Sequence, residues 1–482
     1  MIDLRPVFYV IGLMTAALGL FMIAPMIADL AANSPNWRAF AMSAFVTVAL
    51  GLGIAVTCRQ GRRQGLSIRQ TFLLTTLTWS LLPVAATLPM LIGAPRVGFT
   101  DAFFEAVSGM TTTGSTVIEG LEHRPPGLIL WRAILQWIGG IGIIVVAMAF
   151  LPAMKVGGMQ FFRSEGFDTF GKILPRAAEI AVSIGWIYLG LTGACLLAYE
   201  AAGMGFFDAL IHAMTTIATG GFSSWDASFA RFAGPAEYVA ILFMILASLP
   251  FVRFIQLAAG TARPLFRDPQ IRAYLALILG LSLGMAALRT VLDGVPLEES
   301  LRQSSFNIVS ILSGTGYASA DYMTWGAFAV AVFFLIGLIG GCTGSTACSV
   351  KIFRYQIAIA SIGAQIRSLH SPHGVFVPRY QGRRVDREVI NSVSAFFALF
   401  FFTLTAIALI LSVLGLDTIT AVSGAATALA NIGPGLGDEI GPTGNFARLS
   451  DPAKWVLTAA MLIGRLELFA VYILLTRRFW AD

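Results

Sequence analysis

Four short polar segments, each ending in a glycine, recur along the chain and limit its fold more than any other feature. They are FEAVSGMTTTG ending at Gly114, LIHAMTTIATG ending at Gly220, FNIVSILSGTG ending at Gly316 and SGAATALANIG ending at Gly433. Each segment lies between two apolar runs, and 57% of all residues are hydrophobic while only 12% are charged. A soluble domain carries roughly 25% charged residues. The chain is therefore expected to cross a membrane many times and to repeat one unit four times.

Basic segments predict the orientation of the chain. The segment CRQGRRQGLSIRQ at 58–70 follows the second apolar run and contains arginines but no acidic residue, so the positive-inside rule places it in the cytoplasm. Further basic segments lie at 155–176, 253–272, 351–387 and 477–478. Two strong apolar runs separate consecutive basic segments. All of them are therefore expected on the same side, together with the N- and C-termini.

This counting also predicts the architecture. Two crossings per copy return the chain to one side, so the copies share an orientation and can surround a pseudo-fourfold axis along the membrane normal, whereas inverted repeats need an odd number of crossings. We expect an all-α polytopic membrane protein with four parallel helix–pore loop–helix repeats and an N-terminal two-helix hairpin. The expected units are the hairpin with its basic loop at 1–70 and the repeats at 71–176, 177–271, 272–387 and 388–482.

The polar segments suit a cation pathway. A helix of about eleven residues is about 16 Å long, half the hydrocarbon thickness, so it can enter a membrane but not cross it. Irregular backbone at that depth is tolerated only inside protein or along a watery path. Glycine can adopt the positive φ that ends a helix, and rings of carbonyl oxygens can replace the water shell of a monovalent cation. The alternative is a set of small-residue helix-packing motifs, which four regularly spaced copies disfavour.

The segments and their flanks resemble a known family. The quartet TTGST, ATGGF, GTGYA and NIGPG is similar to the filters of the Trk/Ktr/HKT superfamily of potassium transporters, as are QWIGGIGIIVVAMAFLP, GGCTGSTACSVKIFR and MLIGRLELF elsewhere in the chain. The resemblance covers the whole chain, and the N-terminal hairpin favours the bacterial TrkH branch over the shorter KtrB branch. It implies the potassium translocation subunit of a Trk system, with channel-like uptake across the bacterial inner membrane.

The resemblance also implies which residues meet the ion. Backbone carbonyls that line potassium sites would belong to Thr112, Thr113, Ala218, Thr219, Gly314, Thr315, Asn431 and Ile432, and Gly114, Gly220, Gly316 and Gly433 would let the backbone turn. Three copies have threonine before the glycine, whereas the fourth has Ile432 and a proline, Pro434, after the glycine. We expect an asymmetric ring with weaker selectivity for potassium over sodium than a symmetric ring. Equal conductance of the two ions would support this expectation, and strict exclusion of sodium would contradict it.

The second helix of the third repeat is expected to be broken. Its middle contains Gly340, Gly341, Thr343, Gly344 and Ser345, and each glycine in a helix interior costs about 1 kcal/mol relative to alanine. The resemblance implies an intramembrane loop that gates the pore beneath the filter. The alternative is small-residue helix packing.

Arg465 lies inside the last apolar run, with Glu467 two residues away. At this spacing the two side chains do not face each other on a helix, and an arginine at membrane depth needs a partner or a watery cavity. Two roles stay open. The favoured one is a positive barrier just inside the filter, and the other is a structural ion pair with an acidic residue on another helix.

Enzymatic chemistry is not expected. The chain has no HExxH, Walker A or GxSxG motif, and its four cysteines have no metal-ligand spacing. No cofactor is expected beyond the transported potassium ion. A proton- or sodium-coupled symporter of the same fold is the alternative function, although the filter segments contain no evident titratable group.

The remaining expectations concern partners and polar residues. The resemblance implies a homodimer and a cytoplasmic TrkA-type ring of RCK nucleotide-binding domains; contact with membrane lipid is expected, and nucleic acid is not. His212 is expected to be packed and hydrogen-bonded. Asp101, Asp208 and Asp417 precede or begin the short helices, where a carboxylate favours the positive helix N-terminus.

Overall fold

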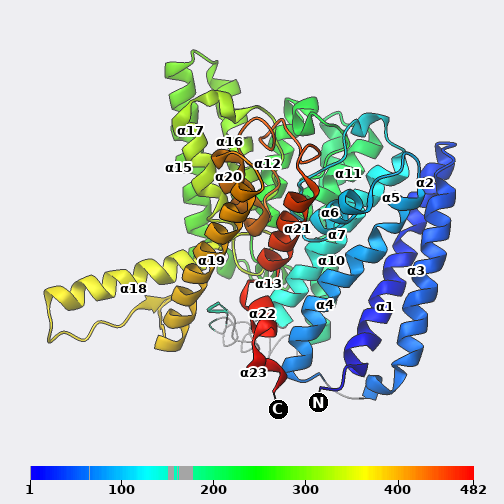
Figure 1. Ribbon diagram of the computed structural model, residues 1–482. Coiled ribbons are helices and arrows are strands. Elements are labelled where there is room, and N and C mark those ends of the chain that lie inside the picture. Colours follow the sequence, from blue (N-terminus) through cyan, green and yellow to red (C-terminus); the bar gives the residue numbers. More distant parts are fainter. Residues whose placement is uncertain (1, 64–65, 150–156, 160, 162–176, 482) are drawn as a thin grey trace.

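The protein is a bundle of α-helices with one short β-hairpin (Figure 1). The structure is a computed structural model of the 482-residue chain and describes residues 2–63, 66–149, 157–159, 161 and 177–481. Within these ranges, seven helices are long and apolar enough to cross a membrane, and two further spans are helix pairs bent at a short break. The predicted all-α membrane fold is confirmed. The predicted basic segment 155–176 lies almost entirely outside the described residues.

An N-terminal hairpin comes first. It consists of α1 (Arg5–Phe21), α2 (Ile23–Ala31) and α3 (Trp37–Thr57), followed by the 3-10 turn η1 (Arg59–Arg63). Glycine lets α1 and α3 pack backbone to backbone, because a Cβ atom on Gly51 would collide with the backbone of Ala16. Such close approach is typical of helix pairs in membranes, where lipid is as apolar as the side chains and packing drives association.

Four similar units follow the hairpin. The first contains α4 (Ile68–Ala86), α5 (Leu88–Ile92), α6 (Phe99–Met110), η2 (Leu121–His123) and α7 (Pro126–Ala149). The second contains α10 (Ala177–Ala201), α11 (Phe206–Ile217), η3 (Ser228–Phe232), α12 (Pro235–Ala247), α13 (Phe251–Ala258) and α14 (Arg263–Arg267). The third contains α15 (Pro269–Leu292), α16 (Leu297–Ser313), η4 (Tyr322–Trp325), α17 (Ala327–Gly337), α18 (Ile352–His370), β1 (Arg379–Tyr380) and β2 (Arg383–Arg384). The fourth contains α19 (Arg387–Val413), α20 (Thr418–Ala430), α21 (Asp451–Arg465), α22 (Phe469–Tyr472), η5 (Ile473–Leu475) and α23 (Arg477–Trp480).

The last long helix of each unit differs between the units. Helix α7 is continuous as far as Ala149. The pair α12 and α13 is bent by 90°, and α21 bends by 103° into α22. Helix α17 ends at Gly337 and α18 begins only at Ile352, so the predicted break in the third repeat is confirmed. The residues between them are called loop 338–351 below.

Glycines bring these long helices against the C-terminal ends of the short helices α6, α11 and α20. A Cβ atom on Gly139 of α7 would collide with the carbonyl oxygen of Met110, the last residue of α6. A Cβ atom on Gly464 of α21 would collide with the carbonyl of Leu429 near the end of α20. The short helices therefore end deep in the bundle, at a depth that side chains on the long helices would prevent.

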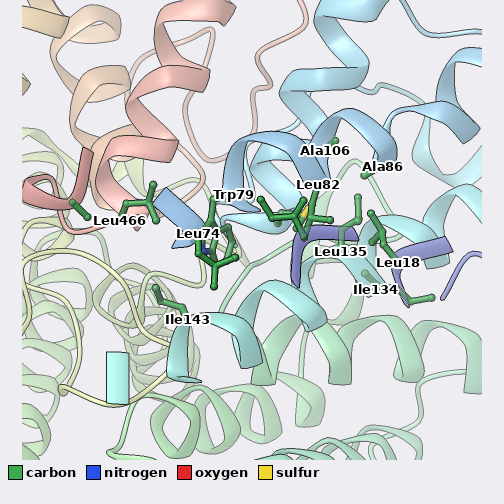
Figure 2. Close-up of a cluster of buried hydrophobic side chains, with 14 of the residues drawn as sticks. Leu18, Leu74, Trp79, Leu82, Ala86, Ala106, Ile134, Leu135, Ile143 and Leu466 are labelled. Carbon is green, nitrogen blue, oxygen red and sulfur yellow. The ribbon is translucent and has the colours of Figure 1, made fainter. Parts of the chain in front are cut away.

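The largest buried cluster joins the hairpin to the first and last units. Figure 2 shows Leu18 of α1 and Leu82 of α4 near Ala106 of α6 and Leu135 of α7. Leu466, just after α21, belongs to the same cluster. The end of the chain is thus packed against the hairpin and the first unit.

Candidate functional site

The helices that precede the four glycines are α6, α11, α16 and α20, which we call the short helices, although α16 has 17 residues and is longer than predicted. All four end in the same unusual backbone conformation. After each helix, two residues separated by one position have positive φ. These pairs are Thr112 (51°) and Gly114 (87°), Thr219 (49°) and Gly221 (76°), Gly314 (77°) and Gly316 (80°), and Asn431 (53°) and Gly433 (114°). L-residues rarely adopt positive φ, and glycine adopts it without steric strain. The pattern defines four equivalent segments, 111–115, 218–222, 313–317 and 430–434, which we call the ring segments.

This pattern corrects the alignment predicted for the second repeat. Gly220 was expected to match Gly114, but the residue with positive φ is Gly221. Two consecutive glycines make the two alignments equally plausible from sequence. Gly220 is therefore equivalent to Thr113, and the residue before the key glycine is threonine in only two repeats, not three. Ala218 is correspondingly equivalent to Thr111, at the end of the short helix.

The ring segments close on one another in chain order. A Cβ atom on Gly114 would collide with the carbonyl oxygen of Gly220 in the second segment. The same collision would occur between Gly221 and the Thr315 oxygen, and between Gly316 and the Ile432 oxygen. A Cβ atom on Gly433 would lie 3.0 Å from the Thr113 oxygen, and the Ser115 hydroxyl donates to the Gly433 carbonyl at 2.7 Å. The fourth segment thus returns to the first, and side chains have no room at these four glycines.

One cavity opens onto all four of these glycines. It has a volume of about 400 Å³, and its lining includes Gly114, Gly221, Gly316 and Gly433. Residues 441–446 and the acidic residues Glu119 and Asp226 also line it. The loop that contains residues 441–446 lies between α20 and α21 at the end of the bundle opposite the two chain termini (Figure 1). The cavity that this loop lines is therefore at that end.

Different polar contacts hold the individual ring segments. In the first segment the hydroxyls of Thr111 and Thr113 are 2.7 Å apart, and in the third the hydroxyls of Ser313 and Thr315 are also 2.7 Å apart. In the fourth, the Asn431 amide donates to the Thr113 hydroxyl at 2.9 Å. The first and third segments are therefore held by matching hydroxyl pairs, and the fourth is tied to the first.

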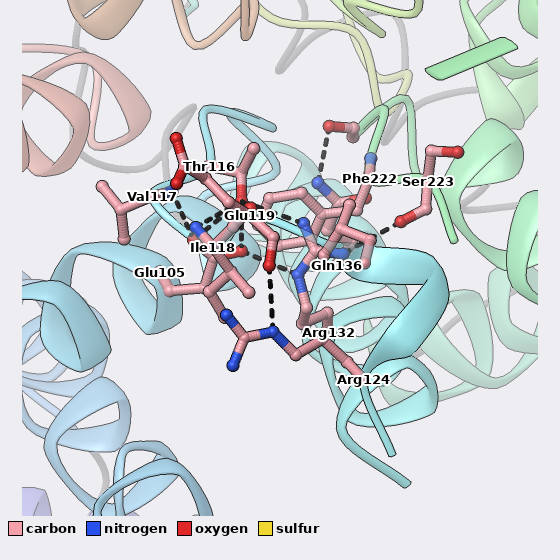
Figure 3. Close-up of polar contacts among 12 residues, drawn as sticks. Glu105, Thr116, Val117, Ile118, Glu119, Arg124, Arg132, Gln136, Phe222 and Ser223 are labelled. Carbon is pink, nitrogen blue, oxygen red and sulfur yellow. Dashed lines mark hydrogen bonds and ion pairs between the residues drawn. The ribbon is translucent and has the colours of Figure 1, made fainter. Parts of the chain in front are cut away.

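A buried ion pair lies behind the first and second segments (Figure 3). The Arg132 Nε atom on α7 donates to Glu105 Oε1 on α6 at 2.7 Å, and neither side chain is exposed by more than 1%. Arg132 also donates to the Ser223 carbonyl at 2.9 Å, and Glu105 accepts from the Val117 backbone at 2.9 Å. This pair was not predicted from the sequence. A carboxylate inside a short apolar helix was the signal that could have revealed it.

Loop 338–351 contacts ring segments at their helix ends, through Thr112 and Ala430, on the side away from the cavity, which we call beneath the ring. The Ser349 backbone donates to the carbonyl of Ala430, the last residue of α20, at 3.0 Å. The Thr343 backbone donates to the Gln270 side chain at 2.9 Å. The Cys342 backbone donates to the Ser248 carbonyl at 3.1 Å, at the bend between α12 and α13. Contacts from the second and fourth repeats, and from the third repeat to which it belongs, therefore hold this loop.

Small residues allow the backbone of the loop to turn sharply. Gly340 and Gly344 have φ of 80° and 76°. A Cβ atom on Gly341 would contact the Ser248 side chain at 3.2 Å, and the Ser345 hydroxyl donates to the Cys342 carbonyl at 2.7 Å. The five loop residues named from the sequence thus lie together in one buried, non-helical segment. The packing alternative, in which they belong to a continuous helix, is wrong.

Arg465 is buried between this loop and α7. Its Nη1 atom donates to Cys348 Sγ at 2.6 Å, and Cys348 Sγ lies 3.6 Å from the Thr112 hydroxyl in the ring. Its Nε atom has no hydrogen-bond partner in the described part of the chain. Among the described residues, no carboxylate lies within ion-pair distance of Arg465, so the predicted alternative of a structural ion pair is not found there.

Glu467 instead pairs with one cation at the end of the loop and one at the start of α18. It contacts Lys351 at 3.3 Å and also binds Arg354, and all three side chains are nearly fully buried. The Arg354 side chain further donates to the Val350 carbonyl at 2.7 Å. These charges join the residues just after α21 to the start of α18.

The other polar predictions have mixed outcomes. His212 is fully buried, with Nδ1 2.8 Å from the Asp208 carbonyl and Nε2 3.0 Å from the Ser223 hydroxyl, as predicted for a packed, hydrogen-bonded residue. Asp417 accepts the backbone N–H groups of Ile419 and Thr420. Hydrogen bonds, chiefly from the Thr420 side chain, hold the pKa of Asp417 below its usual range.

The other two aspartates lie in the first turns of their helices but bind side chains instead. Asp101 pairs with Lys454 at 2.7 Å, and Asp208 accepts from the Ser224 hydroxyl at 2.6 Å. They therefore join a short helix to another part of the bundle, which the sequence analysis did not predict.

Comparisons with known proteins agree with this architecture. A family model described as TrkH, a cation transport protein, matches residues 37–480. The Trk system potassium uptake protein TrkI of Halomonas elongata is 45% identical over 98% of this chain and 96% of its own length. The TrkH protein of the same organism is 35% identical over 99% of both chains. The crystal structure of the potassium transporter TrkH from Vibrio parahaemolyticus matches with a TM-score of 0.91 and 33% identity, covering 100% of both chains.

Proposed function

The chain belongs to the TrkH family of cation transport proteins, and we propose that the ring is its potassium-selective passage. The predicted family is confirmed. The protein is a multi-pass membrane transporter and not an enzyme, and potassium is its substrate. The observation that carries the proposal is the set of four positive-φ glycines, which line one cavity and each abut a carbonyl of the next segment.

In this proposal, backbone carbonyls replace the water shell of the ion as it leaves the cavity. The candidate carbonyls, after the corrected alignment, are those of Thr112, Thr113, Thr219, Gly220, Gly314, Thr315, Asn431 and Ile432. The four short helices point their C-terminal ends at the ring, which adds negative potential for a cation. Neutral backbone oxygens bind potassium without holding it too tightly to leave.

Loop 338–351 and Arg465 form the proposed gate. The loop crosses the axis beneath the ring, held by neutral hydrogen bonds that a small rearrangement can break. Arg465 contacts Cys348, which in turn contacts Thr112 of the ring. Its positive charge at this place repels a cation that leaves the ring. Potassium passage then requires the loop and Arg465 to move away from the axis.

The proposal also covers the membrane in which the protein lies, its orientation and its partners. We place it in a bacterial inner membrane with both termini in the cytoplasm, because the positive-inside rule assigns the basic segments of the sequence, and the termini with them, to the cytoplasmic side. A homodimer and a cytoplasmic ring of TrkA-type nucleotide-binding domains are proposed from the family resemblance. Helix α18 offers a surface for such contacts, since Ile359, Ile366 and Leu369 are 61–73% exposed on it.

The test uses a bacterial strain that lacks its own potassium uptake. Wild-type protein should restore growth at low potassium and support ion uptake, and Gly114→Ser should abolish both because the added side chain fills the ring. Gly53→Ser is the matched control, since Gly53 lies on the exposed surface of α3 with nothing near its Cβ position. Equal rescue by wild type and Gly114→Ser would refute the proposed passage.

A flux assay in liposomes separates channel-like uptake from coupled transport. We expect a flux that reverses with the potassium gradient alone. Flux that depends on a proton or sodium gradient would instead support a symporter of the same fold.

A further inference from the structure

The second ring segment lacks the pair of hydrogen-bonded hydroxyl groups that the first and third segments have. The first and third segments each contain a pair of hydroxyl side chains, but the equivalent positions of the second segment are Ala218 and Gly220. Neither residue has a side-chain hydrogen-bonding group. Within this segment the Thr219 hydroxyl donates to the Ala218 carbonyl at 2.8 Å, but the Gly220 carbonyl needs support from elsewhere in the bundle.

Gln136 of α7 provides that support (Figure 3). Its Nε2 atom donates to the Gly220 carbonyl at 2.5 Å, and its Oε1 atom accepts from the Phe222 backbone at 3.0 Å. The two bonds bracket Gly221, as a neighbouring strand would in a β-sheet. The Phe222 N–H also fixes the orientation of the amide, because only the oxygen can accept from it. Gln136 is fully buried, so water does not compete for these bonds.

The same contact explains why the second segment has two consecutive glycines. Gly221 needs positive φ, whereas Gly220 does not have it. A Cβ atom on Gly220 would instead overlap the side-chain amide of Gln136. A glycine at this position therefore leaves room for a side chain from the neighbouring repeat.

Gln136 makes one carbonyl of the ring different from the other three. The carbonyls equivalent to Gly220 belong to Thr113, Thr315 and Ile432, and no donor from the described residues reaches their oxygens. An oxygen that already accepts a hydrogen bond is held in place and offers a weaker field to a cation. Selectivity between potassium and sodium depends on the field strength and mobility of such ligands. A weaker field favours the larger potassium ion, because sodium needs stronger ligands to offset its greater dehydration.

We propose that Gln136 is a specificity-determining residue that positions the Gly220 carbonyl and lowers its field strength, favouring potassium over sodium. It acts through the backbone and does not touch the ion, so it is a positioning residue. This inference rests on the proposed role of the ring as the ion passage.

The test compares potassium and sodium uptake by purified protein in liposomes. Gln136→Met keeps the length of the side chain but cannot donate to Gly220, and the ratio of potassium to sodium flux should fall about two- to tenfold, the equivalent of one net hydrogen bond. Gln70→Met is the matched control: Gln70 is also buried and hydrogen-bonded, but it lies at the start of α4, far from the ring, so the ratio should stay at the wild-type value.

A second variant decides the matter if Gln136→Met does not fold. Gly220→Ala places a methyl group where the Gln136 amide lies, so it should lower the flux ratio in the same direction. An unchanged ratio, with both fluxes reduced equally, would overturn the inference and leave Gln136 with a structural role only. Wild-type protein that carries no potassium would instead refute the proposed ion passage, so the two failures are distinguishable.

Discussion

The ring and the layer beneath it are built from different chemistry. All four repeats contribute to the ring through neutral groups, namely backbone carbonyls, hydroxyls and amides. Among the described residues, the layer beneath contains loop 338–351 and buried charges such as Arg465 and Glu467, which belong to the third and fourth repeats. A group that must surround a cation needs contributions from every side, whereas a group that blocks a path can come from one side. The ring is therefore built from four equivalent segments, whereas the layer beneath it is not.

The largest effect is expected from a change to the ring itself. Gly221→Ala should reduce potassium uptake to background, because Gly221 has φ of 76° and its Cβ would collide with the Thr315 carbonyl. Gly220→Ala should retain uptake with altered selectivity, since only the Gln136 side chain stands in its way. Uptake by the two variants in the potassium-dependent strain measures the difference. A greater loss of potassium uptake in Gly220→Ala than in Gly221→Ala would support the sequence-based alignment, in which Gly220 matches Gly114.

In the layer beneath the ring, the largest effect on stability is expected from Glu467→Gln. The change leaves Lys351 and Arg354 buried without a carboxylate, and breaking a buried pair in this way costs about 3–5 kcal/mol. Thermal unfolding in detergent should show a clear fall in the midpoint. Glu298→Gln is the control, because Glu298 is 65% exposed and its loss should leave the midpoint nearly unchanged. Equal midpoints for the two variants would show that the charged layer does not stabilise the fold.

Arg465→Ala tests the gate and should have a smaller effect. Removal of the positive charge beneath the ring should raise potassium flux about tenfold, which corresponds to about 1.4 kcal/mol of barrier. Arg465→Lys retains the charge and should stay close to wild type. Flux measured in liposomes with correctly folded protein decides between the two roles. Unchanged flux in Arg465→Ala would leave the arginine with a structural role through its bond to Cys348.

The smallest effect on stability is expected from loss of the ion pair between Lys454 and Asp101. Lys454→Met removes the ion pair with Asp101, whose side chain is 34% exposed. Solvent screens such a pair, so the change in unfolding free energy should be less than about 1 kcal/mol. The midpoint of thermal unfolding, measured for this variant and for Glu467→Gln under the same conditions, checks this prediction. A shift as large as that of Glu467→Gln would mean that the two pairs are equally shielded from solvent.

The membrane fold and the break in the third repeat could be predicted because they follow from local composition. Apolar runs of sufficient length must span a membrane, and loop 338–351 has too many glycines to continue a helix. The buried pair of Glu105 and Arg132 could not be predicted in the same way, because its residues come from two helices and bind backbone from two repeats.

The sequence by itself determined that four equivalent glycine-ended segments exist, because each segment carries its own pattern. It did not determine which of Gly220 and Gly221 takes the positive φ, since both can adopt it. The Thr315 carbonyl and the Gln136 side chain decide that choice, and both approach from other repeats. The partner of Arg465 was decided in the same way, by a sulfur atom that the loop brings beneath the ring. Contacts between residues far apart in the chain depend on the packed structure, so only the tertiary structure could decide them.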